Sequence, residues 1–126
     1  MIRSFSVIAW SFIITLFTSC FSDELFVKSL DELNCDQTQA TTITYDDAIC
    51  LIVGHADIKI KVQEFESKIK EKNIRLDGWL LYAVQRNDSS WYTSITSRGV
   101  IPAYQCTASF DNKGQLLTDV NCSYNK

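Results

Sequence analysis

The stretch "TYDDAICLIVGHADIKIKVQEFESKIKEKNI", residues 44–74, decides the fold, because its apolar residues recur at alternating steps of three and four. This spacing places them on one face of an α-helix. The predicted seam consists of Ala48, Leu51, His55, Ile58, Val62, Phe65 and Ile69. Thr44 with Asp47 three residues later predicts a capping box at the start. We therefore predict one long helix.

The two halves of this helix differ in composition. The first half is apolar on nearly all sides, whereas the second carries alternating lysines and glutamates away from the seam. Ile58, Ile60 and Val62 also alternate as they would in a strand, but the length of the run and its Glu/Lys content favour helix. Gly54 is the position where this helix is weakest and where a break is to be expected if there is one.

From Gly78 onward the apolar period changes to two, which predicts strands. The four expected strands are "GWLLYAVQ" (78–85), "WYTSITS" (91–97), "AYQCTASF" (103–110) and "LLTDVNCSY" (116–124). Upstream, "DELFVKSLDEL" (23–33) predicts a short helix. The fold class is therefore α+β, with one long N-terminal helix packed on a four-stranded antiparallel β-meander and braced by two disulfides.

The N-terminus has the features of an export signal. Arg3 is followed by an apolar run over residues 5–17, which is short for a transmembrane helix. We predict a cleaved signal peptide, residues 1–22, and a single domain over residues 23–126.

Cys20 has a second reading, because "LFTSC" resembles the bacterial lipoprotein pattern. The leader would then be residues 1–19, and a lipid on Cys20 would anchor the protein. Both readings predict export: the protein is periplasmic or secreted, or is held at a membrane as a lipoprotein. Membrane contact is expected only through this lipid.

The chain has five cysteines, and removing or acylating Cys20 leaves an even four. An even number in an exported chain predicts disulfides. The four expected to pair are Cys35, Cys50, Cys106 and Cys122. Neighbour pairing, Cys35 with Cys50 and Cys106 with Cys122, is favoured. However, a tight turn after Phe110 would set Cys106 opposite Asp119, so the other connectivities stay open.

Motifs of catalysis are absent from the sequence, which predicts a protein that is not an enzyme. His55 is the single histidine and lies on the apolar seam; there is no nucleophile elbow, phosphate loop or dinucleotide fingerprint. We expect no metal and no cofactor. The net charge of −3 and the lack of a basic stripe predict no nucleic-acid binding. Three acidic pairs, at 23–24, 31–32 and 46–47, leave a small hydrolase as a minor alternative.

Recognition of another protein is the favoured function. Trp91 and Tyr92 follow a polar turn, and Val100 and Ile101 fall in a loop between strands, as exposed anchors of an interface do. The alternative is that both aromatic side chains pack across the hairpin with Trp79 and Tyr82.

A long helix followed by an antiparallel meander is similar to the arrangement of the cystatin family, and "LIVG" (51–54) resembles its inhibitory loop. Cys50 stands where that motif has glutamine, and the segment lies in the predicted helix, so the inhibitory function is not carried over. We predict a small exported non-enzymatic binding protein, an inhibitor or immunity-type ligand of another secreted or envelope protein. The alternative is a lipid-anchored accessory of envelope assembly; the oligomeric state is left open.

Overall fold

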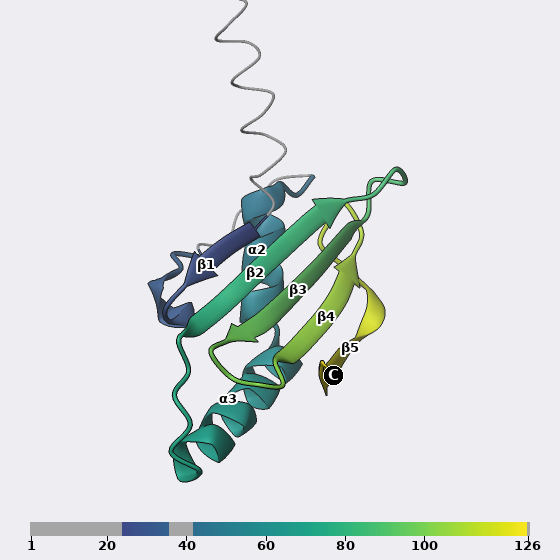
Figure 1. Cartoon of the computed structure of the whole chain (residues 1–126). Helices are drawn as coiled ribbons and strands as arrows, with labels where there is room; N and C mark the ends of the chain where they lie inside the picture. The colour runs from purple at the N-terminus through teal and green to yellow at the C-terminus, as the bar shows by residue number, and fades with distance from the viewer. Residues whose placement is uncertain (1–23, 36–41, 126) are drawn as a thin grey trace, which may run out of the picture.

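A computed structural model describes residues 24–35 and 42–125. The predicted signal peptide and Cys20 lie outside these residues. The described elements are β1 (Glu24–Val27), the 3-10 helix η1 (Leu30–Glu32), α2 (Tyr45–Gly54), α3 (Ala56–Glu71), β2 (Gly78–Gln85), β3 (Trp91–Arg98), β4 (Tyr104–Phe110) and β5 (Leu116–Tyr124). The strands form one antiparallel sheet in the order β1-β2-β3-β4-β5 (Figure 1).

The prediction of one long N-terminal helix on a four-stranded meander is wrong: the sheet has five strands and the helix is divided into two. The extra strand, β1, comes from the segment predicted as a short helix. It pairs antiparallel with β2, placing Val27 opposite Trp79. Local apolar spacing in this segment fits a helix, but pairing with a distant strand overrides such local preferences.

The helix breaks at His55, whose backbone is extended (φ −65°, ψ 132°). The buried residues of α2 are Ala48, Ile49, Ile52 and Val53, and those of α3 are Ile58, Val62, Phe65 and Ile69. At 3.6 residues per turn, the centres of these two sets would lie about 140° apart around one straight helix. A straight helix would bury one set and expose much of the other. The break turns both sets towards the sheet.

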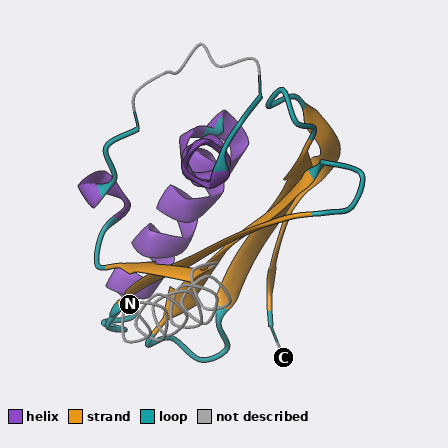
Figure 2. Ribbon diagram, turned by 90° about the horizontal axis from the view of Figure 1, so that it is seen from above, coloured by secondary structure: helices purple, strands orange, loops and turns teal. Residues whose placement is uncertain are grey.

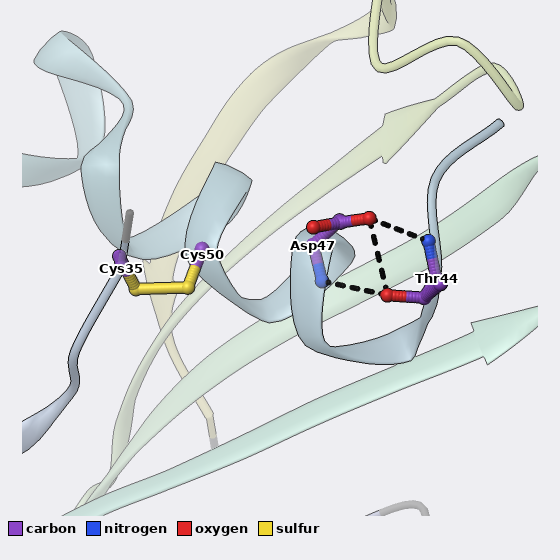
Figure 3. The surroundings of a disulfide bond; sticks show 4 residues. All are labelled: Cys35, Thr44, Asp47 and Cys50. Carbon is purple, nitrogen blue, oxygen red and sulfur yellow. Dashed lines mark hydrogen bonds between the residues drawn. A yellow bond between two sulfur atoms is a disulfide. The ribbon is translucent and has the colours of Figure 1, made fainter. Parts of the chain in front are cut away.

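Each half of the divided helix has its own N-terminal cap. The predicted capping box is present: the Asp47 N–H donates to Thr44 Oγ1 over 3.4 Å, and the Thr44 N–H donates to Asp47 Oδ2 over 2.9 Å (Figure 3). In α3 the cap is His55, whose Nδ1 accepts from the Asp57 N–H over 3.3 Å. His55 therefore begins a helix and does not lie inside one.

Both helices cover the same face of the sheet (Figure 2). The core lies between these two layers. Alternate residues of β2, Trp79, Leu81 and Ala83, are buried against the helices. Phe65 of α3 stacks on Tyr104 with ring centroids 4.7 Å apart, and its ring meets Trp79 edge to face.

Two disulfides join the four described cysteines, which confirms the prediction of disulfide bonds. Cys35 is bonded to Cys50 of α2 (Figure 3), and Cys106 of β4 is bonded to Cys122 of β5. This is the nearest-neighbour pairing. Disulfides indicate an oxidising, extracellular type of compartment. Within the described residues, no helix combines the length and the apolar character needed to cross a membrane.

The register of β4 and β5 explains how the second disulfide forms. The Asp111 N–H donates to the Gln115 carbonyl, so the turn is tight, yet Cys106 lies directly opposite Cys122. Irregularities between Thr107 and Phe110 shift the register along the way. Such bulges insert extra residues into one strand and so bring the two cysteines level.

Candidate protein-binding surface

The structure separates the four predicted binding residues. Trp91 and Tyr92 begin β3, whereas Val100 and Ile101 follow its end. An eight-residue strand is roughly 27 Å long at about 3.4 Å per residue, so the two pairs lie at opposite ends of the sheet.

Trp91 and Tyr92 also point to opposite faces. Trp91 is buried on the helix-covered face opposite Phe110, and its indole N–H has no hydrogen-bond partner among the residues that the structure describes. Tyr92 is half-buried on the outer face, 6.2 Å from the Tyr82 ring and beneath the Arg86 guanidinium. Tyr92 therefore packs across the hairpin with Tyr82, and Trp91 belongs to the core.

Ile101 is the described hydrophobic residue with the greatest exposure, at 97%. Its neighbour Val100 is buried and anchors the loop on the core. Gly99 begins the loop with φ +92°, where a Cβ would lie 2.6 Å from the Asp77 carboxyl carbon. The left-handed backbone favours glycine here, and a Cβ would also displace the Asp77 side chain.

Hydrogen bonds fix the far side of the same loop. The Tyr104 N–H donates to Ser97 Oγ over 2.8 Å, and the Asn125 N–H donates to the Ala103 carbonyl over 2.7 Å. The loop is thus tied to β3 and to the C-terminal end of β5. Ile101 projects from a braced turn.

A groove of about 580 Å³ lies beside Ile101. The end of α3, the loop after β3 and the end of β5 contribute its lining. We name this site the Ile101 surface; it is lined by Lys68, Ile69, Lys72, Ile74, Val100, Ile101, Pro102 and Tyr124. Ile74 and Tyr124 are 41% and 46% exposed, so three large apolar side chains face water together.

Sequence reasoning found Ile101 and missed Ile74 and Tyr124. These two residues end up beside Ile101 because α3 and β5 finish at the edge where β3 turns into β4. The sequence carries no local signal for this meeting.

The charges at the Ile101 surface are positive. Lys68 and Lys72 line it, and no carboxylate does among the described lining residues. Beneath it, burial raises the pKa of the Tyr104 hydroxyl, with smaller contributions from Tyr124 and Glu64. Tyr104 therefore stays protonated and neutral at physiological pH.

A second hollow, of about 1130 Å³, lies where η1, the helix break and the β4–β5 turn approach one another. Glu66 borders it, and the pKa of this carboxyl is raised by burial and then by the charge of Asp31. His55 also borders it, with Nδ1 already accepting from the start of α3. Within residues 24–35 and 42–125, no group of three His, Cys, Asp or Glu side chains could hold a metal ion.

The segment "LIVG" forms the last turn of α2, and the preceding Cys50 is bonded to Cys35. It is helix here, so the resemblance to an inhibitory loop has no counterpart in the structure. Comparisons with protein-family models, with curated proteins and with solved structures find no match to this chain.

Proposed function

We propose that this chain is a small exported, non-enzymatic binding protein that docks on a second protein through the Ile101 surface. Its role is that of an inhibitor or immunity-type ligand of another secreted or envelope protein. The observation that carries the proposal is the 97% exposure of Ile101 on a braced turn beside an apolar groove. Export to the periplasm or the extracellular space is part of the proposal, and the two disulfides support it.

The energetics favour an interface at this place. Burying one isoleucine side chain contributes about 1.5–3 kcal/mol, and Ile74 and Tyr124 lie beside Ile101 to add apolar area. Apolar anchors surrounded by a charged rim are the usual anatomy of an interface hot spot. Lys68 and Lys72 supply that rim.

A protein fits this surface better than a lipid bilayer does. The site is a groove with apolar walls, which receives a side chain, whereas a flat bilayer offers none to fill it. The three apolar side chains come with only two lysines, fewer than the cluster of roughly 4–8 basic residues that is typical of binding to an anionic membrane surface.

The test is a quantitative capture from the native compartment with wild-type protein, Ile101→Ser and Ile60→Ser. Ile60 is 53% exposed on α3 and does not line the groove, so Ile60→Ser is the matched control. We expect Ile101→Ser to lose at least tenfold of the captured partner, equivalent to about 1.4 kcal/mol, while Ile60→Ser retains it. Equal capture by all three proteins would refute this function; thermal melts confirm that each variant is folded.

A further inference from the structure

We infer that the partner of the Ile101 surface is an acidic protein segment: an apolar side chain enters the groove and carboxylates meet Lys68 and Lys72. This inference rests on the proposed function, since it names the chemistry of the partner for the same site. It is carried by the placement of charge around the groove.

The end of α3 concentrates positive charge. Residues 68–72 read "KIKEK", with three lysines and one glutamate. Lys68 and Lys72 are one helical turn apart, so they project from the same face, and both line the groove. Lys70 and Glu71 are absent from its lining.

Among the described residues, neither Lys68 nor Lys72 forms an ion pair with a carboxylate. Arg75 Nε lies 3.6 Å from Asp77 Oδ1, so these two side chains form an ion pair with each other. Glu64 is one helical turn before Lys68, close enough to act on Tyr104, but it is not part of the described lining. Among the described lining residues, the apolar groove is therefore bordered by two ammonium groups and by no carboxylate.

The charge of the whole chain makes this pair selective. The chain carries a net charge of −3, so its overall charge disfavours the approach of an acidic partner. A local positive patch on a negative protein sets the orientation in which an acidic partner can dock. The end of the molecule that holds the Ile101 surface offers both attraction and an apolar site.

The lysines also have a role in the helix, since cations near a helix C-terminus stabilise it. The control variant must therefore lose the same amount of helix stability as the test variant. Lys68→Glu and Lys70→Glu reverse the same charge two residues apart on the exposed side of α3, and only Lys68 lines the groove. A difference in binding between these two variants reports on the groove.

The test is an NMR titration of the isotopically labelled mature protein with three synthetic peptides. Each peptide has a central leucine, flanked by glutamates, by serines or by lysines. We expect the glutamate peptide to shift the resonances of Ile74, Ile101 and Tyr124 and to bind at least tenfold more tightly than the lysine peptide. Lys68→Glu should weaken this binding by about tenfold, whereas Lys70→Glu should change it less than twofold.

The outcomes separate this inference from the function on which it rests. Serine or lysine peptides that bind the groove as tightly as the glutamate peptide would overturn the acidic partner and leave protein docking at the Ile101 surface intact. Absence of shifts at Ile101 with all three peptides at millimolar concentration would overturn both. A parallel titration uses anionic phosphatidylglycerol vesicles. Shifts at Ile101 with these vesicles and with none of the peptides would assign the surface to a membrane and overturn both as well.

Discussion

Replacing Ala56 with proline tests the helix break, which is the main difference between the expected and the observed fold. Ala56 is the first residue of α3 and is exposed. Proline is favoured at the first helical position, where the backbone N–H has no intrahelical acceptor. The residue before a proline must be extended, and His55 already is, at φ −65° and ψ 132°.

The expected magnitude follows from these two conformations. A proline that fits its native backbone stabilises a protein by about 0.4–1 kcal/mol, because the unfolded chain loses conformational freedom. For a domain of this size this corresponds to a rise in Tm of about 2–8 °C. In a continuous helix the same substitution would remove a hydrogen bond and clash with the preceding turn, at a cost of about 3 kcal/mol or more.

The assay is thermal and urea denaturation of wild type, Ala56→Pro and Lys61→Pro. Lys61 is exposed inside α3, so proline there should cost about 3 kcal/mol or more. If Ala56→Pro lowers the stability as much as Lys61→Pro does, the helix is continuous through His55. The explanation that a break turns both buried sets towards the sheet would then be wrong.

Three further predictions concern stability. Replacing both Cys106 and Cys122 with alanine opens a loop of 16 residues and should lower the free energy of unfolding by about 3 kcal/mol in urea titrations; a loss below about 1 kcal/mol would contradict this. Glu66→Gln should raise Tm at pH 7. Because the folded-state pKa of Glu66 is raised above its ordinary value of 4.5, wild-type stability is fully present below that value and falls as pH rises, so the two melts should converge near about pH 3.5. An equal difference in Tm between wild type and Glu66→Gln at both pH values would show that the raised pKa of Glu66 is not the cause. Gly99→Ala should lower the unfolding free energy by more than about 1 kcal/mol, since its φ is +92° and a Cβ would meet Asp77; an unchanged melt would refute the close approach.

The buried face of α3 could be read from the sequence, because a helical period is a local property. Ile58, Val62, Phe65 and Ile69 are buried, as their spacing indicates. Gly54, the last residue of α2, marks the weak point of the predicted helix, but the change of phase at His55 could not be predicted because each half has a helical period of its own. The buried faces of α2 and α3 point in different directions around one helix axis. This difference can be recognised only when the buried residues of each half are known.

The fifth strand and the strand register could not be read from local patterns. β1 spans Glu24–Val27, and its strand form depends on pairing with β2, which is far away in the chain. The bulges that lie between the β4–β5 turn and the Cys106–Cys122 pair likewise depend on how two strands pair. Neighbour pairing of the cysteines was favoured from sequence separation, and the turn geometry alone argued against it.

The residues expected to bind a partner show the same division. Ile101 could be found because a loop between two predicted strands exposes its residues. Trp91 and Tyr92 occupy adjacent positions of a strand, and the alternation of β3 mixes apolar and hydroxyl side chains on both faces, so the buried face was not evident. Ile74 and Tyr124 join the site only through the tertiary fold.

Site-specific photocrosslinking tests the proposed function most directly. A photoreactive amino acid is placed at position 101, or at the exposed control position 60, and the protein is irradiated in its native compartment. The proposal predicts one discrete protein adduct from position 101, with an acidic segment at the crosslinked site, and none from position 60. Identical adducts from both positions, or no protein adduct from position 101, would contradict it.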